Sequence, residues 1–201
     1  HNMKGVFVGS GSEGLAQPRI CEEIVSLTKK EASQVSVLYV GTATYDLPVP
    51  KESQTGGLKA LGCTVTSLCC GLHTQDEMKA SIDAADVIVV SGGNTLYAVD
   101  YWKRVGVDTL LAAAAARGVV LAGGSAGAIC WFDAGHSDSA DPDSFRENML
   151  SKAAASRTDG SAGVEGEGNF EAAPTAFDKE WKYIRAPCLG LFPGLVCPHA
   201  G

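Results

Sequence analysis

The chain has 201 residues, which fits one domain and leaves no room for a second of ordinary size. Hydrophobic residues make up 45% of it, enough to fill a core without disulfide or metal staples. The 16 basic and 23 acidic residues give a net charge of -7. That is the wrong sign for a protein that binds a phosphate backbone, so we expect no nucleic-acid partner.

No apolar run reaches the roughly 18 to 20 residues that span a bilayer, and no signal peptide follows the start, so we expect a cytoplasmic protein without a membrane partner. Residues 1–2 are interpreted as a cloning remnant before Met3. The seven cysteines include no C-x-x-C pair, and most lie in apolar runs, which predicts buried free thiols and no metal site. The cysteines in apolar runs are Cys63, Cys69, Cys70 and Cys130.

Short apolar, β-branched runs recur along the chain, and each precedes a helical pattern. The runs are 6–8, 35–40, 65–68, 87–90 and 119–121. Helices are predicted where Ile20, Ile24 and Leu27 share one helical face, and over 94–103 and 112–116. Runs that are apolar throughout are typical of strands covered on both faces. The pattern therefore predicts an α/β fold with three layers, a doubly wound, mostly parallel sheet with helices on both faces, and function in the loops at the strands' carboxyl ends.

The alternating pattern breaks near Asp133. Residues 151–175 are mostly Ala, Ser, Gly, Glu and Asp, so we expect a mobile insertion over 146–179. Strand-like patterns return at 183–185 and 189–197. We interpret residues 1–201 as a single α/β domain.

Two glycine-rich loops each follow a strand and precede a helix. The first, Gly9–Gly14, has the G-x-G-x-x-G spacing of a dinucleotide site, but the strand that ends at Thr42 carries no acid to hold a ribose. We therefore expect no organic cofactor and a loop that lines a different site, with nucleotide binding as the weakest alternative. The second, Ser91–Thr95, can gather N–H groups for an oxyanion, or can simply form a sharp turn capped by a polar side chain.

The strongest signal is an apolar strand that runs into the sequence Gly123–Ala128. Its Gly123-x-Ser125-x-Gly127 spacing fits a nucleophile elbow. A serine at such a strained strand-to-helix turn presents its hydroxyl above the sheet, and the N–H of Ala126 faces the developing oxyanion. A serine that merely caps a glycine-rich turn is the alternative.

A serine nucleophile needs a base, and the chain has four histidines. His1 and His73 lie in the N-terminal remnant and in a polar surface connection. His199 follows an apolar strand, which puts it at that strand's carboxyl end, beside the elbow of a parallel sheet. His136 lies only eleven residues after Ser125, beyond a short helix, so position favours His199.

Four sequence blocks come in one order from Lys4 to the C-terminus, with the insertion excepted. They are Ser91–Thr95, Gly124–Ala128, Gly135–Ser139, and 189–194 running to Cys197-Pro198-His199. Together they resemble the motifs of peptidase E, the aspartyl dipeptidases, and of the related cyanophycinases. The resemblance implies a peptidase domain with a class I glutamine amidotransferase-like fold in which serine replaces the cysteine.

The same resemblance implies hydrolysis of dipeptides or short peptides with an N-terminal aspartate, without a metal or organic cofactor. By motif, Ser125 is the nucleophile, His199 the general base, and the N–H groups of Gly93 and Ala126 the oxyanion hole. Asp138 matches an acidic position that the family needs for activity. Four further residues are expected to contact the substrate: Gly92, Asn94, Gly124 and His136.

An aspartyl substrate calls for a guanidinium partner, and no motif places one. The candidates are Arg104, Arg146, Arg157 and Arg185, although a salt-bridged surface arginine is the commoner case.

Relatives continue well past the Pro–His motif, and a glutamate proposed as the third triad member lies in that part. The chain ends two residues after His199. Three interpretations stay open: a truncated product, a shortened protein in which Asp138 or Asp141 orients the imidazole, or an inactive protein. The alternative functions are a cyanophycinase-like hydrolase of β-aspartyl linkages and a non-catalytic binding or regulatory homologue. The oligomeric state is also open, a homodimer included.

Overall fold

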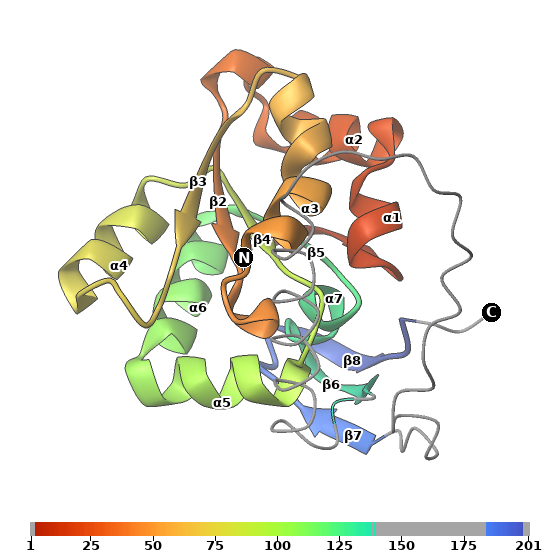
Figure 1. The fold of residues 1–201 in the computed structure, drawn as a ribbon, viewed down its shortest axis with the longest axis vertical. Coiled ribbons are helices and arrows are strands. Elements are labelled where there is room, and N and C mark those ends of the chain that lie inside the picture. Colours follow the sequence, from red (N-terminus) through yellow and green to blue (C-terminus); the bar gives the residue numbers. More distant parts are fainter. Residues whose placement is uncertain (1–2, 138, 140–183, 199–201) are drawn as a thin grey trace, which may run out of the picture.

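Five strands form a parallel sheet at the centre of the molecule, shown by a computed structural model that describes residues 3–137, 139 and 184–198 (Figure 1). The strands are β1 (Lys4–Val8), β2 (Ser36–Val40), β3 (Thr64–Leu68), β4 (Val87–Val90) and β5 (Val120–Gly124). Their order across the sheet is β1-β5-β4-β2-β3, and every neighbouring pair is parallel. All five strands overlap the predicted runs, although β1 begins two residues earlier and β5 ends three residues later than predicted.

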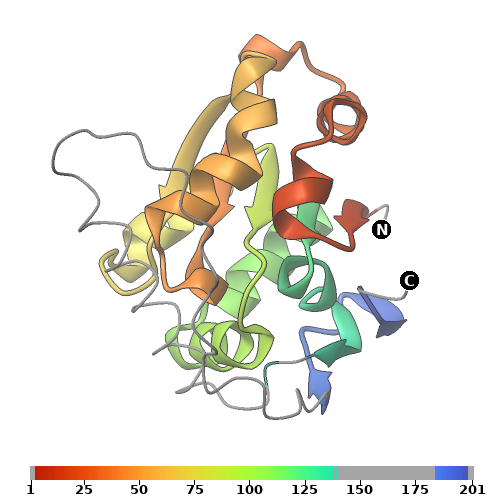
Figure 2. The same ribbon diagram turned by 45° about the vertical axis from the view of Figure 1, so that its right-hand side comes forward.

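Helices cover both faces of this sheet. Successive residues of a strand point to opposite sides, so an apolar strand has apolar side chains to bury on each face. In β4, Val87 and Val89 pack in one hydrophobic cluster, whereas Ile88 and Val90 pack in the other. The first cluster is closed by α1 (Gly11–Leu15), α2 (Pro18–Thr28) and α3 (Pro48–Ala60). The second is closed by α4 (Gln75–Asp83), α5 (Thr95–Val105), α6 (Val107–Arg117) and α7 (Ala126–Ile129). The two layers of helices are seen on either side of the strands in Figure 2, and the predicted three-layer α/β fold is confirmed.

The helices begin and end at residues that suit helix termini. Thr74 and Glu77 form a capping box at the start of α4, in which each side chain bonds the other residue's backbone N–H. Asn94 caps α5 by accepting a hydrogen bond from the N–H of Tyr97, and Gly106 ends that helix with φ at 72°. The helix predicted over 94–103 is therefore α5, and His73 lies in the connection before α4, as expected.

Three further strands form a separate small sheet. Two of them confirm the strand-like patterns at 183–185 and 189–197, but one expectation is wrong. The three strands are β6 (Phe132–Ser137), β7 (Ile184–Pro187) and β8 (Phe192–Val196), in the order β7-β6-β8. The break in the alternating pattern expected near Asp133 follows β6, which ends at Ser137, and residues 140–183 lie outside the described residues. The strand predicted over 189–197 does not extend the main sheet, because β8 pairs with β6 instead. The small sheet has partly exposed strands built from small and polar residues, so β6 lacks the continuous apolar run of a strand buried on both faces.

An aromatic cluster joins the two sheets. Phe7 of β1 meets Phe132 of β6 edge to face with ring centroids 5.2 Å apart, and it meets Phe192 of β8 at 5.3 Å. Edge-to-face pairs at such distances are favourable beyond the area they bury. The small sheet is thereby fixed against the edge of the main sheet that β1 forms.

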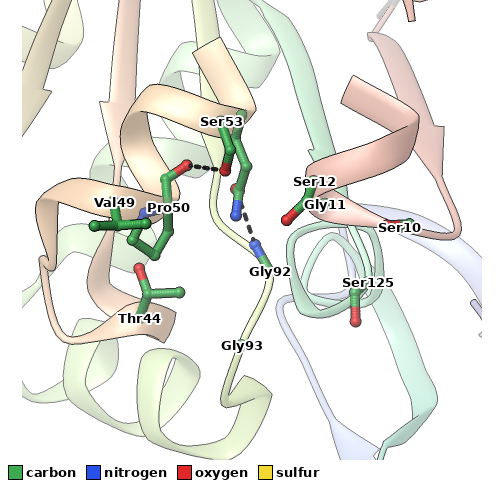
Figure 3. A pocket seen from close by; sticks show the side chains of 11 residues that line it. Ser10, Gly11, Ser12, Thr44, Val49, Pro50, Ser53, Gly92, Gly93 and Ser125 are labelled. Atoms are coloured by element: carbon green, nitrogen blue, oxygen red, sulfur yellow. Dashed lines mark hydrogen bonds between the residues drawn. The ribbon is translucent and has the colours of Figure 1, made fainter. Parts of the chain in front are cut away.

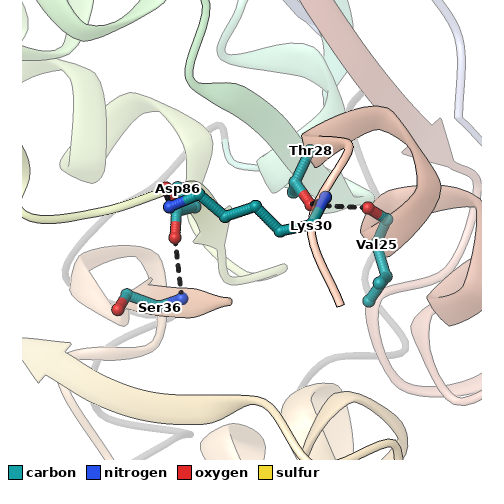
Figure 4. Close-up of polar contacts among 5 residues, drawn as sticks. All are labelled: Val25, Thr28, Lys30, Ser36 and Asp86. Atoms are coloured by element: carbon teal, nitrogen blue, oxygen red, sulfur yellow. Dashed lines mark hydrogen bonds and ion pairs between the residues drawn. The ribbon is translucent and has the colours of Figure 1, made fainter. Parts of the chain in front are cut away.

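At the amino ends of the central strands, Asp86 connects neighbouring elements (Figure 4). Its carboxylate pairs with Lys30 at 2.7 Å and accepts a hydrogen bond from the N–H of Ser36 at 3.1 Å. Its backbone N–H donates to Ser36, and its carbonyl accepts from the N–H of Val120. Asp86 thus ties together the starts of β2, β4 and β5, at the end of the sheet opposite to the candidate site.

All seven cysteines are free thiols. Five are buried as expected: Cys21, Cys63, Cys70, Cys130 and Cys188. Cys69 is only partly buried, because it lies where the chain leaves β3 and its thiol donates to Asp46, and Cys197 is exposed. In the described part of the chain, no helix combines the length and the apolar character that crossing a membrane requires. The insertion expected over 146–179 lies outside the described residues.

Candidate active site

Ser125 occupies a strained turn between β5 and α7. Its φ of 54° and ψ of -120° lie in a region that non-glycine residues rarely adopt. Its N–H donates to the carbonyl of Val8 at 3.1 Å, and its carbonyl accepts from the N–H groups of Ala128 and Ile129. These bonds hold the turn from both sides, so the strain is sustained by the surrounding fold.

Glycines around Ser125 allow the backbone segments to pack this closely. A Cβ atom on Gly123 would lie 2.2 Å from the carbonyl oxygen of Gly127, and one on Gly127 would lie 2.1 Å from that of Val90. A Cβ on Gly124 would meet the carbonyl oxygen of Ser10 at 2.5 Å. Side chains at these positions would displace backbone atoms, so the G-G-S-A-G sequence is a requirement of the turn.

The loop after β4 lies beside Ser125. A Cβ on Gly92 would be 3.6 Å from the Cβ of Ser125. Gly93 has a φ of 118°, and a Cβ there would be 2.3 Å from the carbonyl oxygen of Ala43. The same carbonyl accepts the N–H of Asn94 at 2.8 Å, which fixes the loop at the start of α5.

Two backbone amides of these loops are unoccupied donors. Among the described residues, neither the N–H of Gly93 nor that of Ala126 has a hydrogen-bond acceptor. The N–H of Gly92, in contrast, donates to Oε1 of Gln54 at 3.2 Å. Preorganised N–H groups with no partner are suited to stabilising negative charge that develops on a reacting oxygen.

A pocket of about 360 Å³ opens beside Ser125 (Figure 3). Loops after β1, β2, β4 and β5 and the start of α3 supply its lining: Ser10, Gly11, Ser12, Thr44, Val49, Pro50, Ser53, Gln54, Gly92, Gly93 and Ser125. In Figure 3 the loop of Gly92 and Gly93 lies between the α3 side of the pocket and the side that carries Ser125.

This pocket lies where the topology of the sheet predicts a ligand site. The chain leaves β2 toward β3 and leaves β4 toward β5, in opposite directions, and the pocket forms at the carboxyl ends of these strands. Its lining in the described part of the chain includes hydroxyl and amide groups but no charged side chain. No group of three or more His, Cys, Asp or Glu side chains among the described residues is arranged to hold a metal ion.

The first glycine-rich loop is explained by the same packing. A Cβ on Gly9 would meet the carbonyl oxygen of Pro198 at 2.4 Å, and one on Gly14 would meet Val8. A Cβ on Gly11 would lie 3.3 Å from Gln54. The G-x-G-x-x-G spacing thus meets packing needs of this loop, which lines the pocket.

A buried hydroxyl network anchors the end of β6 to α5. Ser137 donates its hydroxyl to Oγ1 of Thr95 at 3.2 Å, and the N–H of Thr95 donates to Oγ of Ser139 at 3.0 Å. Asp138, between these two serines, lies outside the described residues. His199 also lies outside them, after Pro198, whose carbonyl oxygen packs on Gly9.

The remaining candidates lie apart from the pocket lining. His136 is exposed on β6, with Nδ1 3.5 Å from the Sγ of Cys197, and is paired in register with Arg185 of β7. Arg104 forms an ion pair with Asp100 at 2.7 Å on the exposed side of α5. Arg146, Arg157 and Asp141 lie outside the described residues.

The structure therefore brings Ser125 together with Gly92, Gly93, Gly124 and Ala126. Sequence reasoning missed the contribution of the helix after β2, above all Gln54. No local pattern marks this residue, because its contact with Gly92 spans 38 positions.

Comparisons with known proteins agree with this architecture. The model of the family described as peptidase family S51 matches residues 6–154. A Trypanosoma brucei brucei protein named G2/mitotic-specific cyclin-1 is 30% identical over 98% of this chain and 61% of its own length. The uncharacterized peptidase YgaJ of Bacillus subtilis (strain 168) is 31% identical over 68% of this chain and 60% of its own length.

The fold is also found among solved structures. A crystal structure of a Listeria monocytogenes EGD-e protein, provisionally named peptidase E, matches with a TM-score of 0.55 and 18% identity, covering 75% of this chain and 87% of that one. At that identity the match shows a shared fold. The chain spans about 60% of the length of the two curated relatives above.

Proposed function

Because the chain belongs to peptidase family S51, as its match over residues 6–154 shows, we propose that the protein is a serine peptidase with Ser125 as its nucleophile. Its substrates are dipeptides or short peptides with an N-terminal aspartate. The single observation that carries the proposal is the backbone of Ser125, strained at φ 54° beside a pocket. The N–H groups of Gly93 and Ala126, which have no acceptor among the described residues, support it.

The reaction follows from the chemistry of these groups. Oγ of Ser125 attacks the carbonyl carbon of the scissile peptide bond while its proton passes to a base. The carbonyl oxygen becomes an oxyanion and accepts hydrogen bonds from the N–H groups of Gly93 and Ala126. Collapse of this intermediate breaks the C–N bond, the amine leaves with a proton from the base, and water then hydrolyses the acyl-enzyme ester.

We assign the base to His199 and the acidic partner to Asp138, on the family resemblance of their motifs. The described neighbours of both residues support this assignment. The carbonyl of Pro198 packs against the loop after β1, and Ser137 and Ser139 bind the helix that follows the oxyanion loop. An acid beside the imidazole would orient it and stabilise its protonated form.

Two further parts of the proposal concern the substrate and the location of the protein. Gly92, Asn94, Gly124 and His136 are proposed to contact a small peptide, with no metal or cofactor. We place the protein in the cytoplasm because all its seven cysteines are free thiols, which persist in a reducing compartment.

The test is hydrolysis of an aspartyl chromogenic amide by the 201-residue chain, by the full-length gene product, and by Ser125→Ala of both. We expect turnover that Ser125→Ala abolishes while the thermal unfolding midpoint changes little. Turnover in the full-length product alone would place an essential element beyond these residues. Turnover that survives Ser125→Ala would refute the proposal.

A comparison of Asp-X dipeptides with β-Asp-Arg separates a dipeptidase from a cyanophycinase-like hydrolase. Labelling of Ser125 by a serine-directed phosphonate separates both from a non-catalytic homologue, since labelling requires an activated hydroxyl.

A further inference from the structure

Gln54 is buried between the two glycine-rich loops of the pocket. It lies on α3, and the residue is only 4% exposed. A Cβ on Gly11 would lie 3.3 Å from the amide of Gln54 and 3.3 Å from the nitrogen of Gly92. One turn later on the same helix, Gly57 packs on Cys21 of α2, where a Cβ would come within 2.5 Å of the sulfur, so α3 is also held close to α2.

Three successive backbone N–H groups of the loop after β4 differ in their hydrogen-bond acceptors. The N–H of Gly92 donates to Oε1 of Gln54 at 3.2 Å, and the N–H of Asn94 donates to the carbonyl of Ala43 at 2.8 Å. The N–H of Gly93, between them, has no acceptor among the described residues. The loop is thus held on both sides of one available donor.

The two glycines make this restraint necessary. Consecutive glycines have access to many backbone conformations, so fixing them carries a large entropic penalty. Ala43 restrains the loop through backbone, whereas Gln54 is the side chain that restrains it at Gly92. Because Gln54 accepts the N–H of Gly92, the N–H of Gly93 is the donor of this glycine pair that stays available to a ligand.

We infer that Gln54 is a positioning residue of the peptidase reaction: it holds the loop after β4 so that the N–H of Gly93 points to the oxyanion. This inference rests on the proposed function. Gln54 acts through Gly92 and is not itself a catalytic residue. An oxyanion donor is useful only if it is oriented before the charge develops, so the loss should fall on kcat rather than on substrate binding.

The test uses three variants in the full-length gene product. Gln54→Met keeps the length of the side chain and removes the acceptor, whereas Gln54→Glu keeps an oxygen within reach of Gly92. Glu52→Gln is the matched control, because Glu52 lies on the same helix, pairs with Lys59 and points to solvent. Each is assayed for kcat and KM with the aspartyl amide, for its rate of phosphonate labelling, and for thermal unfolding.

We expect Gln54→Met to lower kcat and the labelling rate by roughly 10- to 100-fold with KM within about threefold, since a donor misplaced by about 1 Å can cost that much. Gln54→Glu should recover most of this loss, and Glu52→Gln should match the wild type. Should Gln54→Met not fold, Gln54→Asn, which withdraws the oxygen from Gly92, carries the same expectation.

A kcat of Gln54→Met within threefold of the wild type would overturn the inference, as would a change confined to KM, which would make Gln54 a substrate contact. These outcomes differ from a failure of the proposed function, which is tested by Ser125→Ala. If Ser125→Ala retained turnover, Ser125 would not be the nucleophile and the proposed function itself would be wrong.

Discussion

The hydroxyl of Ser137 donates to Oγ1 of Thr95 at 3.2 Å and so joins the small sheet to the first residue of α5. Both residues are buried, and the network continues through Ser139, which accepts the N–H of Thr95 and donates its own N–H to Ser137. Thr95 follows the loop of Gly93, so these bonds connect the loop after β4, whose Gly93 N–H we propose as an oxyanion donor, to the end of β6. The geometry of one depends on the other.

Thr95→Val is expected to destabilise the fold by about 1–3 kcal/mol, because it keeps the shape of the side chain but leaves the buried hydroxyl of Ser137 without its partner. Combined with Ser137→Ala, the two losses should be less than additive by about 0.5–1.5 kcal/mol in a double-mutant cycle measured by urea unfolding. Strictly additive losses would show that the two hydroxyls do not interact.

The main sheet and the Ser125 turn could be predicted because their signals are local. A strand covered on both faces shows an unbroken apolar run, as Val87–Val90 does, and a tight strand-to-helix turn shows its glycines within a few residues. For the small sheet, the strands β7 and β8 could be predicted, but β6 and the pairing of the three strands could not. Its strands have exposed residues such as His136 and Arg185, and these two residues pair across 49 positions of the sequence.

The role of Gln54 could not be predicted from the sequence either, for a different reason. Its role comes from a contact with Gly92 that exists only once α3 has packed on the sheet. Nothing in the local sequence Pro48–Ala60 distinguishes this glutamine from a surface residue. Long-range polar contacts of this kind become apparent only from the three-dimensional arrangement.

Gly127→Ala is expected to lower stability by about 3 kcal/mol or more, because its Cβ would lie 2.1 Å from the carbonyl oxygen of Val90 and backbone would have to move. The control is Gly56→Ala in α3, where a Cβ would meet no atom within 4 Å. That change should instead stabilise by about 0.5–1 kcal/mol, as alanine does in place of a helical glycine. Chemical denaturation measures both, and equal effects of the two variants would contradict the close packing at Gly127.

Tyr39 should make the protein sensitive to alkali. Burial raises its pKa to about 12, although the nearby hydroxyls of Thr44 and Ser91 act in the opposite direction. The unfolded tyrosine titrates near 10, so above that pH the native state retains the proton that the unfolded state loses, and stability falls as pH rises. From pH 8 to pH 11 the loss from this residue is on the order of 1 kcal/mol.

Tyr39→Phe removes this titration, so the free energy of unfolding of the wild type should decline more steeply with pH than that of the variant. Other tyrosines and lysines titrate in both proteins and cancel in the difference. Parallel declines between pH 8 and pH 11 would show that the phenol ionises as readily in the folded protein as in the unfolded chain.

The thiols should react in a distinct order with a disulfide reagent such as dithiobis-nitrobenzoate. Cys197 is exposed, whereas burial raises the pKa of Cys70 and of Cys188 to about 11 and so suppresses the reactive thiolate. Cys69 is partly buried and donates to Asp46, and burial raises its pKa as well. We therefore expect one fast thiol in the native protein, lost in Cys197→Ser, and seven after unfolding, one for each free cysteine. A fast phase that persists in Cys197→Ser would mean that a second thiol reaches solvent. Cys69 would then be the next cysteine to replace by serine, because it is the only other cysteine that is not buried.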